Sequence, residues 1–156
     1  MGKVEEIKKS RPSINEYFMA LAEIVSRRST CRHRDQGTVL VKDNRLITTG
    51  YNGSPPKQPH CIEIGYCAKA EGLSCRAEGL HGESNAIASA ALLGVSTKGA
   101  TAYCIYSPCL VCCNLLKSAG VVKVIYQHVY AGFPEGPDYL SRTLRIEVEK
   151  YDRKPD

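Results

Sequence analysis

The order of predicted strands and helices constrains the fold of this 156-residue chain more than any other feature of its sequence. Residues 38–41 and 46–49 are apolar, β-branched runs joined by the turn-forming segment 42–45, which predicts a hairpin. The predicted elements after it are a helix over 86–93, a strand over 102–106, a helix over 110–119, a strand over 121–126, a short helix over 138–144 and a strand over 145–148. Strands that alternate with helices after an opening hairpin indicate an α/β layered fold with a mixed sheet.

One more helix is predicted before the hairpin. Ser13 is its expected N-cap, and Glu16, three residues later, completes a capping box. Apolar residues recur from there at helical spacing: Ile14, Tyr17, Phe18, Leu21, Ile24 and Val25. Gly94 is expected to stop the helix over 86–93, as glycine commonly does.

The chain is long enough for one domain with a single core. We expect a lead-in over 1–12, a single domain over 13–150 and a tail over 151–156. Residues 53–80 are dense in glycine, proline, cysteine and polar groups, which predicts a long irregular insertion. A loop of this length inside a compact domain is usually functional, or is held by something other than a core.

The composition of the chain indicates its cellular compartment and the kinds of partner to expect. Residues 1–11 lack the apolar centre of a secretory signal, and no run approaches the ~20 apolar residues that cross a membrane. We therefore expect a cytosolic protein without a membrane partner, in which eight cysteines favour metal binding or catalysis over disulfides. The net charge is +5, with the basic residues spread along the chain, so a nucleic-acid partner is not expected.

Two motifs carry the candidate chemistry. His81 and the pair Cys109 and Cys112 each lie at the opening of a predicted helix, and Pro108 suits a helix start. The two cysteines, three residues apart, share one face of a helical turn. One imidazole and two thiolates are three ligands for Zn²⁺, which leaves a fourth position for water, as catalytic zinc sites require.

Glu83 lies two residues after His81 and is the candidate catalytic acid and base. Zinc lowers the pKa of a bound water, and a carboxylate can then collect its proton and return it to a leaving amine. The combined pattern matches the H-x-E…P-C-x-x-C signature of zinc deaminases. The alternative interpretation is a partly buried histidine and a helix-start acid, but the two motifs together favour the metal site.

Further segments resemble the deoxycytidylate deaminases, including their competence-associated bacterial members, over nearly the whole chain. They are Tyr17-Phe18-Met19-Ala20, Arg28-Ser29-Thr30-Cys31, residues 37–45, residues 50–55, residues 81–87 and Ser107-Pro108-Cys109 with Cys112. The resemblance implies a three-layer α/β/α fold with a central mixed five-stranded sheet. It also implies zinc-dependent hydrolysis of deoxycytidylate (dCMP) to deoxyuridylate (dUMP) and ammonia, which provides dUMP for thymidylate synthesis. The resemblance further implies a homo-oligomer, commonly a hexamer.

The resemblance also implies substrate-binding residues. Asn52 would bind the 3′-hydroxyl of the sugar, backbone groups around Gly82 would hold the pyrimidine, and Tyr130 would lie near the substrate. Asn52 has the alternative role of a turn residue before glycine, and Tyr130 that of a residue capping a strand end.

The chain departs from the family at two places in this candidate site. Gly82 stands where many relatives have alanine. His33 stands where relatives usually have an arginine that is implied to hold the 5′-phosphate. Its neighbours Arg32 and Arg34 are the substitutes that we expect for that arginine.

The remaining cysteines allow a second metal site, because some relatives bind a structural zinc at this insertion. The expected ligands are Cys31, Cys61 and Cys75, with a fourth from His60 or Cys67. Such a site would order a polar loop that has no core of its own, although unpaired reduced thiols are the alternative. Two further cysteines are predicted to be small buried hydrophobic residues: Cys104 and Cys113.

Two competing functions remain open at this stage. The first is a deaminase of another target, such as a modified deoxycytidylate, a nucleoside or a base in RNA. A nucleic-acid enzyme should bind in a strongly salt-dependent way. The second is a zinc-stabilised scaffold protein without turnover, which would have no use for Glu83 or Asn52.

Overall fold

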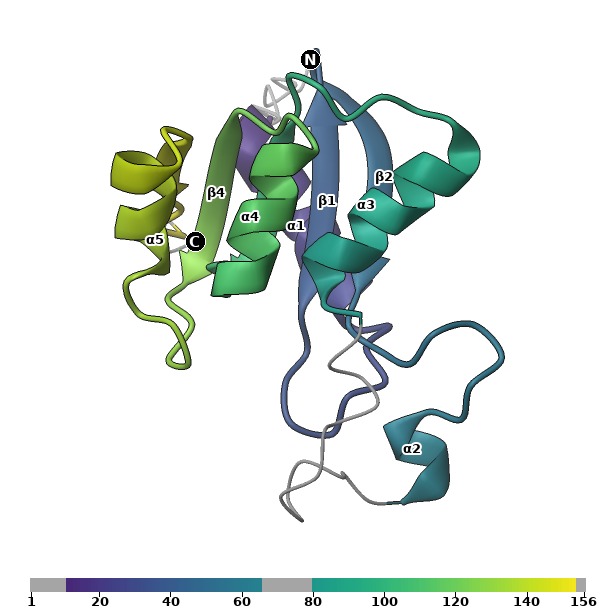
Figure 1. Ribbon diagram of the computed structural model, residues 1–156. Coiled ribbons are helices and arrows are strands. Elements are labelled where there is room, and N and C mark those ends of the chain that lie inside the picture. The colour runs from purple at the N-terminus through teal and green to yellow at the C-terminus, as the bar shows by residue number, and fades with distance from the viewer. Residues whose placement is uncertain (1–10, 66–79, 154–156) are drawn as a thin grey trace, which may run out of the picture.

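The computed structural model describes residues 11–65 and 80–153, which form a five-stranded sheet covered by helices (Figure 1). The strand order is β2-β1-β3-β4-β5. The strands are β1 (Gly37–Lys42), β2 (Arg45–Tyr51), β3 (Thr101–Tyr106), β4 (Lys123–His128) and β5 (Glu147–Lys150). β1 pairs antiparallel with β2 and β3, while β4 pairs parallel with β3 and β5. The predicted hairpin and mixed sheet are therefore confirmed.

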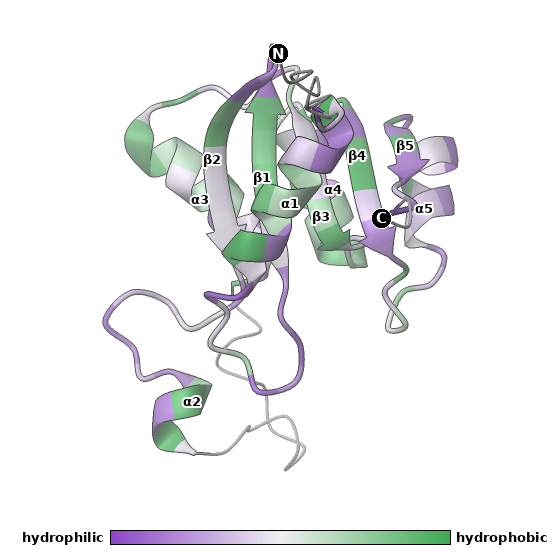
Figure 2. Ribbon diagram, turned by 180° about the vertical axis from the view of Figure 1, so that it is seen from behind, coloured by the Kyte–Doolittle hydropathy of each residue, from purple (hydrophilic) through white to green (hydrophobic). Residues whose placement is uncertain are grey.

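Helices cover both faces of this sheet. α1 (Ile14–Ser26) lies on one face, and α3 (Gly82–Leu93) and α4 (Leu110–Ser118) lie together on the other (Figure 1). In the view from behind, α1 lies in front of the strands (Figure 2). The C-terminal helical segment, α5 (Gly136–Asp138) continued by a π-helix (Tyr139–Thr143), packs against the same core as α3 and α4. This is the expected three-layer α/β/α arrangement.

The period-two alternation of the strands divides the core into two clusters. Leu40 of β1 and Cys104 of β3 face α3 and α4, whereas Val39 and Tyr103 face α1. The helices complete these clusters with Phe18, Met19 and Ala22 from α1 and with Ala86, Cys113 and Leu116 from α3 and α4. Both Cys104 and Cys113 are fully buried, which confirms their predicted role as small hydrophobic residues.

α1 begins as predicted, and half of its predicted apolar stripe faces the core: Phe18 is fully buried, and Leu21 and Val25 pack against the same cluster. The Ser13 hydroxyl accepts from the Glu16 amide and the Glu16 carboxylate accepts from the Ser13 amide, so the capping box is confirmed. Ile14, Tyr17 and Ile24 of the predicted apolar stripe are about half exposed: 47%, 49% and 58%. Ala22, which was not in the predicted stripe, is also buried, and the helix lies close to β1 there, since a Cβ at Gly37 would lie 2.2 Å from the Ala22 carbonyl oxygen.

Two strands start two residues later than predicted. The predicted strand over 121–126 is β4 at Lys123–His128, because the Val121 amide donates to Leu116 at the end of α4, at 3.0 Å. The predicted strand over 145–148 is β5 at Glu147–Lys150, because the Ile146 amide donates to Leu140 at 2.9 Å. In both places the residues after a helix satisfy its last carbonyl groups before the strand can begin.

β5 is an edge strand of the sheet and is highly charged. The Lys123 ammonium of β4 lies 2.8 Å from both the Glu147 and the Glu149 carboxylates of β5. At the other edge is β2, where Gly50 allows close packing of α3, since a Cβ there would lie 2.1 Å from the Gly82 carbonyl oxygen. α3 is thereby held directly on β2, which fixes where its first turn lies.

The insertion after β2 is not wholly irregular. It contains the one-turn helix α2 (Cys61–Ile64), whose start is capped by a bond from the His60 amide to the Glu63 carboxylate at 2.9 Å. Residues 66–79, with Cys67 and Cys75, lie outside the described residues. Within the described ranges, no helix has both the length and the apolar character needed to cross a membrane.

Candidate active site

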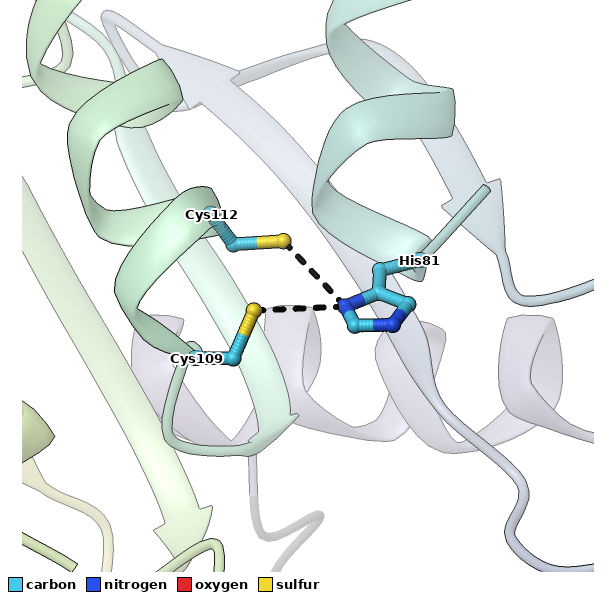
Figure 3. Close-up of side chains that lie close together, drawn as sticks. All are labelled: His81, Cys109 and Cys112. Carbon is cyan, nitrogen blue, oxygen red and sulfur yellow. Dashed lines mark hydrogen bonds between the residues drawn. The ribbon is translucent and has the colours of Figure 1, made fainter. Parts of the chain in front are cut away.

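The first turns of α3 and α4 bring the three predicted metal ligands together. His81 is the N-cap of α3, Cys109 is the N-cap of α4, and Cys112 lies in the first turn of α4. In Figure 3 the His81 ring, at the start of one helix, points toward the two thiol groups at the start of the other. Among the residues that the structure describes, they form the one group of histidine, cysteine and acidic side chains close enough to share an ion.

The geometry of this group fits zinc. The Nδ1 atom of His81 lies 3.4 Å from Cys109 Sγ and 3.5 Å from Cys112 Sγ. A single ring N–H can point well at only one of the two sulfurs. Zinc bond lengths of about 2.0–2.1 Å to nitrogen and about 2.3 Å to sulfur, at tetrahedral angles, place these atoms about 3.6 Å apart. The observed separations and the donor set therefore match three corners of a tetrahedral zinc site.

The two thiols are unequal in acidity. The hydrogen bond with Cys112 lowers the pKa of Cys109 to about 4, and the contact with His81 acts in the same direction. The same bond, together with burial, raises the pKa of Cys112 well above its ordinary value. The pair therefore shares one proton when no cation is bound, and metal binding would release that proton.

Glu83 lies beside this cluster in the first turn of α3 and is only 2% exposed. It is close enough to Cys112 to contribute to the raised pKa of that thiol. Burial raises the pKa of Glu83 above its usual value, although its own backbone amide and the nearby His81 oppose the effect. A carboxyl group with a raised pKa is suited to accept and return a proton near neutral pH.

Gln36 is a residue of this site that the sequence did not predict. Its side-chain Nε2 donates to Glu83 Oε1 at 2.8 Å, and its Oε1 accepts from the Tyr106 amide at 2.9 Å. The side chain is buried, at 7% exposed. A glutamine directly before an apolar strand does not by itself indicate a site residue. Its contact with Glu83 arises only because α3 packs next to the start of β1.

Asn52 is buried and holds the loop before β1. Its Oδ1 accepts from the Gln36 amide at 2.9 Å and from the Ser29 hydroxyl at 2.7 Å. Its Nδ2 donates to the Arg34 carbonyl oxygen at 2.8 Å. One Nδ2 hydrogen remains for a ligand, so the turn-stabilising role and the predicted sugar contact are compatible.

Arg34 and Tyr130 are brought together, whereas Arg32 is exposed. The Arg34 guanidinium lies over the Tyr106 ring, 4.6 Å from its centroid, and over the Tyr130 ring, 4.8 Å from its centroid. The Tyr130 amide donates to the Ser107 hydroxyl at 2.9 Å, two residues before Cys109. A guanidinium between two aromatic rings is held in place by cation–π attraction.

The second predicted metal site is only partly described. Cys61 is buried at the start of α2 and Cys31 is half-buried. The His60 ring lies 3.0 Å from the hydroxyl of Thr30, the neighbour of Cys31. The described residues alone do not bring a third ligand to Cys31 and Cys61, and Cys75 falls in the range 66–79.

Comparisons with known proteins point in one direction. Residues 12–128 match the family described as the cytidine and deoxycytidylate deaminase zinc-binding region. The chain is 38% identical to ComE operon protein 2 of Bacillus subtilis over 142 residues, which cover 91% of this chain and 73% of that protein. It is also 38% identical to the deoxycytidylate deaminase of Schizosaccharomyces pombe over 77% of its own length, but it spans only 38% of that longer enzyme.

The fold is also similar to that of a solved structure. The dCMP deaminase of cyanophage S-TIM5, in complex with dCMP and dUMP, superposes with a TM-score of 0.78 at 33% sequence identity. The match covers 92% of this chain and all of the phage chain.

Proposed function

The chain belongs to the cytidine and deoxycytidylate deaminase family, and we propose that it hydrolyses dCMP to dUMP and ammonia, in supply of thymidylate synthesis. The observation that carries this proposal is the convergence of His81, Cys109 and Cys112 beside the buried carboxyl of Glu83. The likeness to the phage enzyme solved with dCMP and dUMP supports the choice of substrate.

His81, Cys109 and Cys112 would hold the zinc ion, which when bound would supply Lewis-acid activation of a water molecule. Glu83 would take a proton from that water and deliver it to N3 of the pyrimidine and to the departing amine. Backbone groups in the first turn of α3, around Gly82, would bind the pyrimidine carbonyl. The remaining Nδ2 hydrogen of Asn52 would donate to the 3′-hydroxyl of the sugar.

Arg34 is our candidate for the residue that recognises the 5′-phosphate. It is half-buried and stacked on Tyr106 and Tyr130, whereas Arg32 and His33 are exposed. A guanidinium fixed in one orientation loses little freedom when it binds a phosphate. This arrangement would replace the arginine that relatives usually carry at position 33.

The test is steady-state ammonia release by the zinc-loaded protein from dCMP, cytidylate, deoxycytidine and a cytosine-containing oligonucleotide. We expect turnover of dCMP. Arg34→Gln should raise KM for dCMP about 10–100-fold, the loss of a charge-assisted hydrogen bond, and leave deoxycytidine kinetics unchanged. Arg28→Gln, an equal charge change at an exposed position, is the control. A comparable effect of Arg32→Gln would move the phosphate site to Arg32.

The other arms of this assay separate the competing functions. Preferred turnover of deoxycytidine or the oligonucleotide would keep the zinc chemistry and overturn the substrate. A protein that binds zinc and releases no ammonia from any of the four would favour the scaffold function.

We also propose a second, structural zinc held by Cys31, Cys61 and Cys75, with His60 or Cys67 as the fourth ligand. The nearness of His60 to the residue before Cys31, and the capped turn that starts at Cys61, support it. Metal analysis should find two zinc ions per chain, and Cys61→Ala should retain one. A single zinc ion in the unsubstituted protein would contradict this proposal.

We further propose that copies of this chain associate, as the family resemblance to hexamers implies. Leu92 and Leu93 of α3 are 88% and 67% exposed, and Val111 of α4 is 66% exposed. Burial of such large apolar side chains in an interface is favourable. Light scattering should give a mass six times that of the chain, and a monomer at micromolar concentration would contradict association.

Finally, we infer a cytosolic setting. Cys109 and Cys112, the two cysteines of the candidate metal site, are not joined by a disulfide. Thiolate ligands persist where the compartment keeps thiols reduced. Cell fractionation should recover the protein with cytosolic markers, and recovery from an oxidising compartment would overturn this inference.

A further inference from the structure

We propose that Gln36 is a positioning residue that joins Glu83 and Asn52 into one hydrogen-bonded unit, so that the two ends of the substrate are held in register. This inference rests on the proposed function, in which Glu83 acts at the pyrimidine and Asn52 at the sugar. The side chain of Gln36 bonds to Glu83, and the backbone of Gln36 bonds to Asn52.

The side-chain amide of Gln36 has one orientation in this site. Its Oε1 accepts from the Tyr106 amide at 2.9 Å, and its Nε2 donates to the Tyr106 carbonyl oxygen at 3.2 Å. Gln36 lies two residues before Thr38, the first β1 residue paired with β3, and its side chain bonds the Tyr106 backbone in the place where a paired backbone would. Rotating the amide by 180° would oppose acceptor to acceptor, so Nε2 must face Glu83.

This anchored donor fixes the carboxyl group of Glu83. The terminal torsion of a glutamate side chain is broad, so a free carboxylate rotates over a wide range. The 2.8 Å bond from Gln36 Nε2 holds Glu83 Oε1. Proton transfer is then left to Oε2, in a defined direction, and productive geometry is kept from one turnover to the next.

The backbone of Gln36 holds Asn52 at the same time. The backbone N–H of Gln36 donates to Asn52 Oδ1 at 2.9 Å, and the backbone N–H of Asn52 donates to the backbone carbonyl oxygen of Gln36 at 3.2 Å. Glu83 and Asn52 are thus separated by a single intervening residue in the network, although they come from α3 and from the end of β2. A shift of either one is transmitted to the other through Gln36.

Gly82 makes room for this unit. A Cβ at position 82 would lie 3.1 Å from Gln36 Cγ, 3.0 Å from Thr38 Oγ1 and 3.3 Å from the Gly50 carbonyl oxygen. These separations are too close for comfortable contact, and the Gly50 oxygen is backbone that cannot move aside easily. Alanine at position 82 would therefore displace the Gln36 side chain, so we expect the two positions to be energetically coupled.

The first test is Gln36→Met, which keeps the length of the side chain and removes its hydrogen bonds. We expect kcat for dCMP to fall about 10–100-fold, while zinc content and the Kd for dUMP change less than about threefold. Gln127→Met is the matched control, because Gln127 donates to the Glu23 carboxylate at 3.2 Å outside this site. A purely structural role would instead lower the melting temperature and leave kcat unchanged.

The second test is a double-mutant cycle in kcat. Gly82→Ala should slow the unsubstituted enzyme several-fold, but should have little further effect when Gln36→Ala has already removed both the Cγ atom and the amide. Additive effects would overturn the coupling, and an unchanged kcat in Gln36→Met would overturn the positioning role. Absence of dCMP turnover in the unsubstituted protein would instead contradict the proposed function, so the two failures are distinguishable.

Discussion

Glu83→Gln is expected to lower kcat for dCMP by about 10²- to 10⁴-fold, the range that a positioned general acid and base contributes. Glutamine keeps the size of the side chain and can still meet the Gln36 amide through its own oxygen. It cannot accept a proton from water or return one to the leaving amine. The fall should therefore appear in kcat far more than in the affinity for dUMP.

The measurement is ammonia release by protein whose zinc content has been determined in the same sample. Zinc should remain at the level of the unsubstituted protein, because His81, Cys109 and Cys112 are intact. Glu135→Gln, at an exposed position outside the site, is the control. A zinc-loaded Glu83→Gln protein with full turnover would exclude Glu83 as the catalytic acid and base.

Cys109→Ala is expected to remove the zinc of the active site and to abolish detectable turnover. Loss of an outer partner of a metal ligand costs about 10–100-fold in affinity or activity, and loss of a ligand itself should cost more. The metal content should fall by one ion per chain. The melting temperature should fall too, because metal that binds only the folded chain stabilises it.

Cys113→Ala provides a matched control on the same helix. Cys113 lies one residue from Cys112, is fully buried and contacts the Pro108 carbonyl oxygen through its thiol. Its loss should lower stability modestly, as the loss of a small buried group does, and leave the zinc in place. If Cys113→Ala lost the metal and Cys109→Ala retained it, the assignment of the ligands would be wrong.

The sequence was most informative where the chemistry is local to a helix start. Cys109 and Cys112 are three residues apart, so the helix that follows Pro108 places them on one side whatever the rest of the chain does. The capping box of Ser13 and Glu16 is equally local and was predicted correctly. Such features require no knowledge of how distant segments pack.

The features that sequence reasoning missed depend on packing between segments. Gln36 meets Glu83, 47 positions away, because α3 crosses the sheet closely over β2. On α1, the absent side chain of Gly37 allows close approach of the helix at Ala22, which is fully buried, whereas the predicted Ile24 is 58% exposed. In each case a glycine on a strand lets a helix approach closely. The spacing of apolar residues along the sequence does not show where such an approach occurs.

The charged edge of the sheet limits how copies of this chain can meet. An open edge strand offers unpaired backbone groups to a strand of another molecule. Here β5 is four residues long, and Glu147 and Glu149 are both engaged with Lys123. A strand added to this edge would have to cover those ions at a cost in hydration. Copies that associate would therefore meet through the helical layers, and the five-stranded sheet of each copy would stay closed to extension on the β5 side.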